Sequence, residues 1–369
     1  MNPALSIAHT EASMGWGGQE IRILTEARGF LDRGHRVVLC AAPGSRIAAE
    51  AASYGVPHVE LPIGAKRPAG VLALARVFRS GRPDVVNTHS STDSWLAAIA
   101  CRFAPPAPVL VRTRHVSVPV PRDPATRWLY RRATARVVTT GEALAQRLVR
   151  DNGLDPSRVE SIPTGIDLSR YGILARDDAR RSLGLPADAR LTGIVATLRS
   201  WKGHRHLLDA MARPEVGDAI LVVVGDGPQR EALERQAASL GLGARVRFAG
   251  QQRDVAAWLA SLDVFVLPST ANEGVPQALL QAMASGVACV TTNAGAIPEV
   301  ARDGETALVV PPGDSAALSA AIGRLLGDPA LSARLASAAR AFVTPRFGLD
   351  TMLDRMEAAF RRALADAGR

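Results

Sequence analysis

Short apolar segments of strand length alternate with stretches of helix length along most of this 369-residue chain. This alternation is typical of βαβ units, in which a connecting helix makes consecutive strands parallel. It is interrupted around Ile162–Asp167, where no helix can continue through Pro163. Because a second series begins after the break, the sequence predicts two open α/β sheets joined by a hinge, with ligands bound in a cleft at the carboxyl ends of the strands.

The two series divide the chain into a first lobe, residues 1–165, and a second lobe, residues 166–346. The last predicted helix, about 349–367, is compatible with either lobe, and our division lets residues 347–369 pack back on the first. The strands expected in the first lobe are Leu5–His9, Arg36–Ala41, Val56–Leu61, Asp84–His89, Val109–Thr113 and Arg136–Thr139. Those expected in the second lobe are Thr192–Thr197, Ala219–Val224, Val246–Phe248, Val264–Leu267, Ala288–Thr291 and Ala307–Val310.

Composition and length indicate a globular protein with two cores, because 47% of the residues are apolar and 21% are charged. One uncharged stretch, Gly274–Pro298, is long enough to span a bilayer, but its prolines, glycines and polar residues favour a buried loop, helix and strand. The amino-terminal residues Met1–Ile7 show neither a basic leader nor a long apolar run, which predicts that no secretion signal is present.

The cysteines indicate a reducing compartment, so we expect a cytoplasmic protein. Cys40, Cys101 and Cys289 are far apart, odd in number and surrounded by apolar residues, which fits neither a disulfide framework nor a zinc site.

Positive charge is concentrated in the first lobe, which has 21 basic and 13 acidic residues, against 23 and 22 in the rest of the chain. This asymmetry suggests an anionic partner such as a nucleic acid, an acidic glycan or a membrane surface. Residues 122–132 mix arginines with aromatic residues, as in a surface helix that contacts anionic lipid at the inner face of a membrane. A solvated helix face explains the same segment equally well.

Four motifs follow predicted strands of the second lobe. The first, residues 197–204, places Arg199 and Lys202 directly before a helix. Because a helix amino terminus attracts anions, two cations beside it form a suitable site for a diphosphate, although a solvated basic turn is the simpler alternative.

The second motif, residues 224–228, contains the pair Gly225 and Gly227. Arg230 stands where a dinucleotide-binding fingerprint has a third glycine, so a tight turn explains this motif as well.

The third motif is Glu273-Gly274-Val275-Pro276-Gln277. Its carboxylate and the free N–H groups of the helix that follows can bind a polyhydroxyl ligand, and Gln281 lies one turn further along that helix. The fourth, residues 295–300, is another turn that enters a helix.

In this order and spacing, the four motifs resemble those of glycosyltransferase family 4, whose members have two Rossmann-like lobes facing a central cleft, the GT-B fold. The resemblance covers the whole chain. It implies a retaining, nucleotide-sugar-dependent enzyme with an acceptor-binding first lobe and a donor-binding second lobe. Acceptors in this family are often glycolipids or growing surface polysaccharides, which points to cell-envelope polysaccharide or lipopolysaccharide synthesis.

The resemblance also assigns roles to individual residues. Arg199 and Lys202 correspond to the pair that holds the donor diphosphate, and Glu273 to the glutamate beside the reacting carbon. Residues 274–277 correspond to the loop that holds the sugar hydroxyls. Gly17-Gly18 resembles a glycine loop that approaches the donor, and Arg112-Thr113-Arg114-His115 resembles a strand end whose histidine touches the sugar.

Further candidates follow from position in the chain. Gly225 and the segment Gly250–Asp254, with Arg253, are expected to contact the donor, whose base this fold tends to recognise through backbone groups. Trp16 and His89 are candidates for the acceptor side together with His115, although packing explains such histidines as well. Uracil and guanine are equally compatible with these residues.

The chain departs from the family pattern at one position, where Gln281 replaces a second glutamate that usually binds the ribose. An amide still forms hydrogen bonds but loses charge assistance worth about 1 kcal/mol. The sequence contains no Asp-x-Asp pair, so we expect neither a metal nor another cofactor, and we expect the cations to stabilise the leaving diphosphate.

Other functions compatible with the sequence are a nucleotide-sugar-binding homologue without glycosyl transfer, which Gln281 prompts, and an epimerase or phosphorylase of the same fold. A phosphorylase needs a cofactor lysine, for which we find no candidate. Nucleic-acid binding is disfavoured because the sequence has no helix-turn-helix, RNA-binding or zinc-finger signature.

Overall fold

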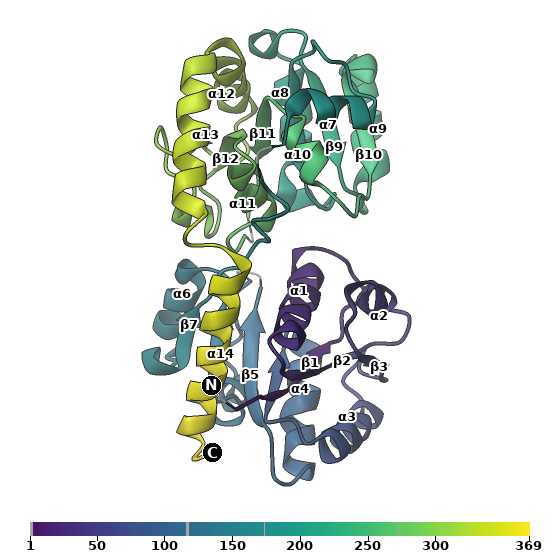
Figure 1. The fold of residues 1–369 in the computed structure, drawn as a ribbon, viewed down its shortest axis with the longest axis vertical. Helices are drawn as coiled ribbons and strands as arrows, with labels where there is room; N and C mark the ends of the chain where they lie inside the picture. The colour runs from purple at the N-terminus through teal and green to yellow at the C-terminus, as the bar shows by residue number, and fades with distance from the viewer. Residues whose placement is uncertain (1–2, 116–117, 173, 272) are drawn as a thin grey trace. The chain divides into compact units, whose positions relative to one another are not determined.

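The protein is described here by a computed structural model that covers residues 3–115, 118–172, 174–271 and 273–369. The chain forms two compact units. Unit 1 comprises residues 1–165 together with 349–369, and unit 2 comprises residues 166–348. Both chain termini therefore belong to unit 1, as Figure 1 shows.

Unit 1 is built on a seven-stranded parallel sheet with the strand order β3-β2-β1-β4-β5-β6-β7. Its strands are β1 (Ser6–Glu11), β2 (Arg36–Ala41), β3 (His58–Glu60), β4 (Val85–Thr88), β5 (Val109–Arg114), β6 (Arg136–Thr139) and β7 (Val159–Ser161). Its α-helices are α1 (Gly18–Asp32), α2 (Arg46–Ala51), α3 (Pro68–Gly81), α4 (Ser91–Ala100), α5 (Pro124–Trp128), α6 (Glu142–Asn152) and α14 (Leu349–Asp366).

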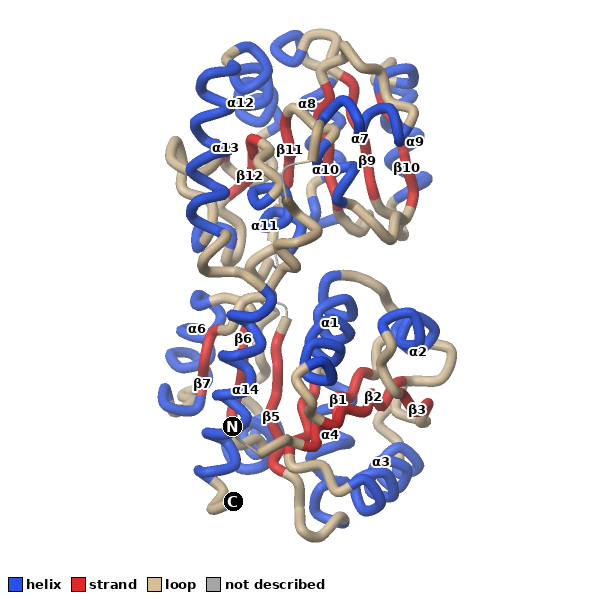
Figure 2. The backbone as a smooth tube through the Cα atoms, in the orientation of Figure 1, coloured by secondary structure: helices blue, strands red, loops and turns tan. Residues whose placement is uncertain are grey.

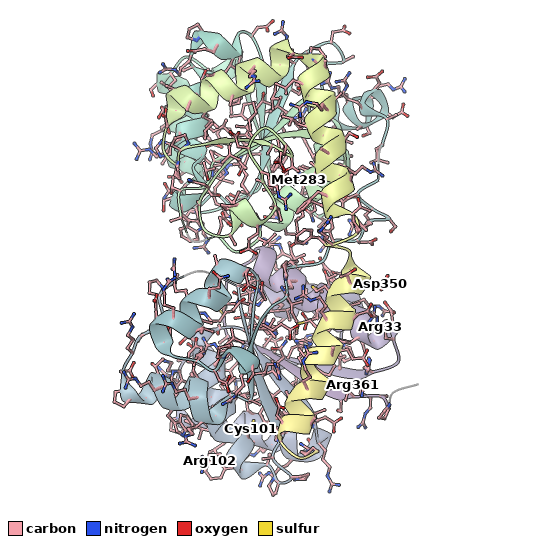
Figure 3. All side chains as sticks on the ribbon, turned by 90° about the vertical axis from the view of Figure 1, so that its left-hand side faces the viewer. Arg33, Cys101, Arg102, Met283, Asp350 and Arg361 are labelled. Carbon is pink, nitrogen blue, oxygen red and sulfur yellow. The ribbon has the colours of Figure 1, made fainter. Side chains whose placement is uncertain are left out.

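Helix α14 comes from the end of the chain and packs on α1 within unit 1. Arg33 at the end of α1 donates to the Asp350 carboxylate at 3.0 Å and to Asp354 at 2.7 Å, and Figure 3 shows Arg33 and Asp350 side by side. Gly29 permits this packing, since a Cβ at that position would lie 2.4 Å from the Leu353 side chain. The ion pairs are partly exposed and add little, so the apolar contact is the larger stabilising term.

Unit 2 is built on a six-stranded parallel sheet with the order β10-β9-β8-β11-β12-β13. Its strands are β8 (Leu191–Val195), β9 (Ile220–Val224), β10 (Val246–Gly250), β11 (Val264–Leu267), β12 (Ala288–Thr292) and β13 (Leu308–Val310). Its α-helices are α7 (Arg176–Leu183), α8 (His204–Met211), α9 (Arg230–Ser239), α10 (Ala256–Ala260), α11 (Gln277–Ala284), α12 (Ser315–Gly327) and α13 (Pro329–Val343).

Each sheet has helices on both faces, which Figure 2 shows as red strands between blue helices. Consequently each unit contains two apolar clusters, one on each face of its sheet. In unit 1 one cluster lies under α1 and α14 and the other under α3 and α4. The prediction of two parallel α/β sheets is confirmed.

Some elements were not predicted. Strand β7 has only three residues, two of them polar, and it pairs only with β6, so it carries almost no apolar signal. Helix α7 was also not predicted. Helix α7 buries only Ala179 and Arg180, and a helix this short and charged lacks a recognisable apolar face.

The uncharged stretch Gly274–Pro298 forms α11 and β12, whose side chains are almost all buried in unit 2, as predicted. Within the part of the chain that the structure describes, no helix has the length and apolar character needed to cross a membrane. The three cysteines are unpaired and buried, and burial raises the pKa of the Cys40 and Cys101 thiols to about 12.

Candidate active site

Both sheets have a point where the strand order reverses direction, and the candidate residues gather at these points. In unit 1 the reversal lies between β1 and β4, and in unit 2 between β8 and β11. In open parallel sheets, ligands bind outside the carboxyl ends of the strands at this reversal, because the helices that follow diverge to opposite faces. The loops after β8 and β11, residues 196–203 and 268–276, are therefore the first place to look in unit 2.

Glu273 and Lys202 meet at this point. Lys202 Nζ lies 2.7 Å from Glu273 Oε1, and Ser269 Oγ donates to the same oxygen at 2.6 Å. The Glu273 side chain is buried, with 6% of its surface exposed, whereas that of Lys202 is 21% exposed. Glu273 Oε2 has no hydrogen-bond partner among residues 3–115, 118–172, 174–271 and 273–369, so it can accept a hydroxyl of a ligand.

Two glycines allow the backbone of neighbouring loops to approach closely at this point. Gly203 has a φ of +75°, and a Cβ there would lie 1.9 Å from the carbonyl oxygen of Pro268. Gly295 has a φ of +59°, and a Cβ there would lie 2.2 Å from the Glu273 carbonyl oxygen. Since both the left-handed conformation and the close approach exclude a side chain, these glycines set the position of Glu273 relative to Lys202.

Arg199 lies in the same loop as Lys202. Its guanidinium carbon is 5.4 Å from the centroid of the Trp201 ring, and the Trp201 carbonyl accepts the Thr270 N–H at 2.8 Å. A short 3₁₀ turn over Ser200–Lys202 leads directly into α8. The two predicted cations thus precede a helix amino terminus, where N–H groups without an intrahelical partner add to the positive potential.

The other predicted donor residues lie at the same sheet edge. Gly225 N–H donates to the Gly250 carbonyl at 2.8 Å, which joins the loop after β9 to the end of β10. Arg253 is exposed in the loop that follows β10. Val275, Pro276 and Gln277 form the entry to α11, with Pro276 at its amino-terminal boundary.

Gln281 is buried in α11, and its amide Nε2 donates to the hydroxyl of Tyr171 at 2.9 Å. Tyr171 is itself buried in the unit 2 core. The Tyr171 hydroxyl, which the sequence did not indicate as a partner, therefore holds the amide in place. The expected contact between Gln281 and a ribose stays a prediction.

In unit 1 the sheet edge carries Glu11 at the end of β1 and the glycine loop before α1. The Glu11 carboxylate accepts the Ser13 N–H at 2.7 Å and the Gln19 amide at 2.5 Å, so it holds both ends of the loop. Burial, followed by the nearby carboxylates of Asp93 and Glu20, raises the pKa of Glu11 to about 8. Glu11 was missed by the sequence analysis, although a carboxylate that ends an apolar strand is a detectable signal.

The residues of the glycine loop have simpler surroundings. Gly17 caps α1, its carbonyl accepting the Ile21 N–H at 3.1 Å, and Gly18 begins the helix. Trp16 packs against the unit 1 core, with the Arg46 guanidinium 5.7 Å from its ring centroid.

Three histidines form a continuous chain across strands β1, β4 and β5. His9 Nδ1 lies 3.0 Å from His89 Nε2, and His89 Nδ1 lies 3.0 Å from His115 Nε2. The rings of His9 and His89 are stacked with centroids 5.3 Å apart, and those of His89 and His115 are tilted at 5.2 Å. His89 and His115 were predicted as site residues, but their contact with each other and with His9 was not.

All three imidazoles are neutral near pH 7. Burial, followed by repulsion from the Arg22 guanidinium, lowers the pKa of His9 to about 3. Burial is also the main reason why the pKa values of His89 and His115 lie well below their ordinary value, with neighbouring histidines and arginines contributing. Arg22 is fully buried on α1, where its Nη1 donates to the Ile162 carbonyl at 2.7 Å.

Arg112 and Arg114, which precede His115, both contact Tyr130. The Arg112 guanidinium lies 4.7 Å from the Tyr130 ring centroid, and Arg114 Nη1 donates to the Tyr130 hydroxyl at 2.8 Å. In the described residues there is no group of three His, Cys, Asp or Glu side chains that could hold a metal ion.

Family models and relatives identify the chain. Residues 16–170 match the model described as Glycosyltransferase Family 4, and residues 175–342 match Glycosyl transferases group 1. The D-inositol 3-phosphate glycosyltransferase of Streptomyces scabiei is 31% identical over 80% of this chain and 72% of its own length. The chain belongs to glycosyltransferase family 4.

Further similarities support this assignment. The lipopolysaccharide core biosynthesis glycosyltransferase LpsE of Rhizobium meliloti is 32% identical over 63% of this chain and 66% of its own length. The structure of Anabaena HepE in complex with UDP-glucose has a TM-score of 0.85 and 24% identity, covering 97% of this chain and 100% of that one. The family 4 glycosyltransferase described here thus has the GT-B type of fold.

Within this glycosyltransferase the predicted residues form two groups. One group lies at one sheet edge of unit 2 and consists of Arg199, Lys202, Gly225, Gly250 and the Glu273–Gln277 segment. The Gly17-Gly18 loop, His89 and His115 gather at the corresponding edge of unit 1.

Proposed function

We propose that this glycosyltransferase transfers a sugar from a UDP- or GDP-linked donor, with retention of configuration, to a glycan or glycolipid acceptor. It would act in the cytoplasm, in the synthesis of a cell-envelope polysaccharide or lipopolysaccharide. The observation that carries the proposal is the buried Glu273 carboxylate, held by Lys202 and Ser269 at the strand-order reversal of unit 2.

The relatives support this choice of substrates. The HepE structure was obtained with UDP-glucose, and the LpsE relative is named for lipopolysaccharide core synthesis. The Streptomyces scabiei relative is named for transfer to a phosphorylated inositol, so the family resemblance does not by itself specify a polymeric acceptor.

The proposed reaction breaks the bond between the anomeric carbon and the donor phosphate oxygen. The acceptor oxygen bonds to the same carbon from the same face, and its proton passes to the leaving phosphate oxygen. Arg199, Lys202 and the first N–H groups of α8 would stabilise the charge that grows on the diphosphate, so no metal is required in this scheme. Glu273 Oε2 would accept a hydroxyl of the donor sugar and orient the anomeric carbon.

Glycosyl transfer is tested by incubating the protein with UDP- and GDP-sugars and a panel of envelope glycolipids, with and without EDTA. The proposal expects a glycosylated product with the donor's anomeric configuration, seen by NMR, and no effect of EDTA. Saturable nucleotide-sugar binding with neither transfer nor slow donor hydrolysis would favour a binding homologue instead. Conversion of the donor sugar without acceptor would favour an epimerase.

A second proposal is that unit 1 contacts an anionic membrane surface through the segment after Val120. Arg122, Arg127 and Arg131 line a surface hollow, together with Asp151 and Asn152. The Arg131 Nη2 atom donates to the Asn152 carbonyl at 2.8 Å, which fixes its side chain on this face. Three guanidinium groups around one hollow can bind lipid phosphates at about 1 kcal/mol each.

Flotation with phosphatidylglycerol and phosphatidylcholine vesicles tests this membrane contact. We expect the protein to float only with the anionic vesicles, and Arg122→Ala/Arg127→Ala to reduce flotation. The matched control is Arg181→Ala/Arg235→Ala, which removes two exposed arginines of unit 2. Equal flotation with both vesicle types, or with neither, would contradict the contact.

A further inference from the structure

The number of protons on the imidazoles of His9, His89 and His115 restricts the direction of the hydrogen bonds between them. A neutral imidazole carries one N–H donor and one bare nitrogen acceptor. His89 contacts a histidine through each of its nitrogens, at 3.0 Å in both cases. It must therefore donate to one neighbour and accept from the other, so the three rings share one direction of hydrogen bonding.

Only two arrangements satisfy both contacts. In one, every ring is protonated on Nδ1: His9 donates to His89, His89 donates to His115 Nε2, and the His115 Nδ1–H is the free end. In the other, every ring is protonated on Nε2: His115 donates inward, and the free end at His9 is an N–H group.

The inner end of the chain distinguishes the two. His9 is fully buried, and its Nε2 has no hydrogen-bond partner among the described residues. An unpaired buried N–H is rarer in folded proteins than an unpaired buried acceptor. The Arg22 guanidinium, which pairs with the Glu26 carboxylate at 3.5 Å, also acts on this end, since its repulsion, after burial, lowers the pKa of His9. A bare nitrogen at His9 Nε2 is therefore favoured over an unpaired N–H, whose positive end a nearby cation repels.

We propose that His9 and His89 are positioning residues that lock His115 in the tautomer protonated on Nδ1. In this state His115 Nε2 is occupied by the proton of His89, and Nδ1 already carries its own proton. His115 then has no lone pair to offer, so it donates a hydrogen bond to a substrate oxygen and does not act as a base. The part of this inference that concerns the substrate rests on the proposed function, whereas the tautomer itself does not.

The backbone holds the rings in register for this chain. His9 lies within β1, opposite Asn87 of the neighbouring strand β4, and His89 directly follows that strand. Asp93 of α4 accepts both the Thr10 hydroxyl at 2.6 Å and the His89 N–H at 2.9 Å, which ties the residue after His9 to His89. The alignment of the first two rings is therefore built into the sheet edge.

The protein also contains a histidine of the opposite tautomer, His35, which serves as an internal reference. His35 Nδ1 accepts the Leu5 N–H at 3.0 Å, so its own proton must be on Nε2, which faces Glu357 at 3.5 Å. One spectrum of the full-length protein should contain both kinds of buried histidine.

The experiment is a long-range ¹H–¹⁵N correlation spectrum of the full-length protein with ¹⁵N-labelled histidine, without ligand. His115 is assigned by its loss in His115→Gln. We expect the Nδ1-protonated tautomer of His115 to be populated roughly fivefold or more over the Nε2-protonated one. This ratio corresponds to about 1 kcal/mol, the lower end of the cost of leaving a buried hydrogen-bonding group without a partner. His35 should be protonated on Nε2. A His115 protonated mainly on Nε2, or on both nitrogens, would overturn the proposal.

Two variants test the role of His89. In His89→Phe the ring shape is kept but the donor to His115 is lost, so the preference for Nδ1 should fall severalfold. In His89→Asn the side-chain amide lies near the former Nδ1 and should restore it. An unchanged His35 signal shows that unit 1 is folded, and an unchanged His115 tautomer in His89→Phe would refute the locking role. Either result is independent of whether the proposed transfer reaction is found.

Discussion

The two units have the same architecture but hold their polar groups in different ways. At the strand-order reversal of unit 2, Glu273 and Lys202 form a charged pair that remains partly open to solvent. At the corresponding place in unit 1, buried polar groups gather: His9 and Glu11 have no exposed surface, and His89 has 4%. Under the proposed function, unit 2 would present charge to the donor, whereas unit 1 would present neutral groups whose proton positions are set by burial.

The largest effect is expected where unit 2 holds its charge. Glu273→Gln keeps the size of the side chain but removes the charge that Lys202 and Ser269 contact, so transfer should fall about 100-fold or more while nucleotide binding is retained. The measurement is the initial rate with a saturating donor.

Glu305→Gln is the matched control for Glu273→Gln, because Glu305 is an exposed carboxylate of the same unit. Equal rates for the wild-type protein and Glu273→Gln would mean that the Glu273 carboxylate does not face the reacting sugar.

The glycine contacts predict the next largest effect. Gly203→Ala places a Cβ against the Pro268 carbonyl and strains a left-handed residue, so unit 2 should lose about 2 kcal/mol of stability or more, together with nucleotide binding. Gly304→Ala has a similar φ, +69°, but no atom within 4 Å of the new Cβ, so it measures the backbone strain alone. Thermal unfolding of both variants should show a clearly larger loss for Gly203→Ala.

The buried carboxyl group of unit 1 predicts a dependence of stability on pH. Because the pKa of Glu11 is raised from 4.5 to about 8, the folded protein retains a proton that the unfolded chain releases. Stability from this group is therefore present below pH 4.5 and is lost as pH rises toward 8. His9 has the opposite sign, but its contribution is complete above its unfolded pKa of 6.5.

Above pH 6.5 the His9 contribution no longer changes, and the variant Glu11→Gln separates Glu11 from Glu26 and Asp93, whose pKa values burial also raises. Urea unfolding of unit 1 should show the free energy of unfolding falling by up to about 1.4 kcal/mol per pH unit there. Glu11→Gln should flatten this slope, and an identical slope in the variant would show that Glu11 is ionised in the folded protein.

The smallest effect concerns the departure from the family pattern. Gln281→Glu restores a charged acceptor beside the Tyr171 hydroxyl, and we expect the nucleotide to bind about fivefold more tightly. Tyr171→Phe/Gln281→Glu removes the hydroxyl that holds the side chain and should lose part of the gain. Unchanged binding by Gln281→Glu would indicate that position 281 does not contact the nucleotide.

The same comparison explains what the sequence could predict. The α/β class and the motifs of unit 2 were predictable because strand periodicity and loop motifs are local features, and Glu273 and Lys202 each lie in such a motif. Their contact joins residues 71 positions apart and depends on two glycine approaches that no local pattern reveals. The histidine chain draws on β1, β4 and β5, so it becomes visible only when the strand order is known.

The most direct test of the account is a calorimetric titration of the protein with UDP and with GDP. We predict saturable binding of one nucleotide, lost in Arg199→Ala/Lys202→Ala and retained in Arg181→Ala/Arg235→Ala, which removes two exposed arginines of the same unit. No binding of either nucleotide at millimolar concentration, or equal binding by both double variants, would contradict the assignment of the diphosphate site to Arg199 and Lys202.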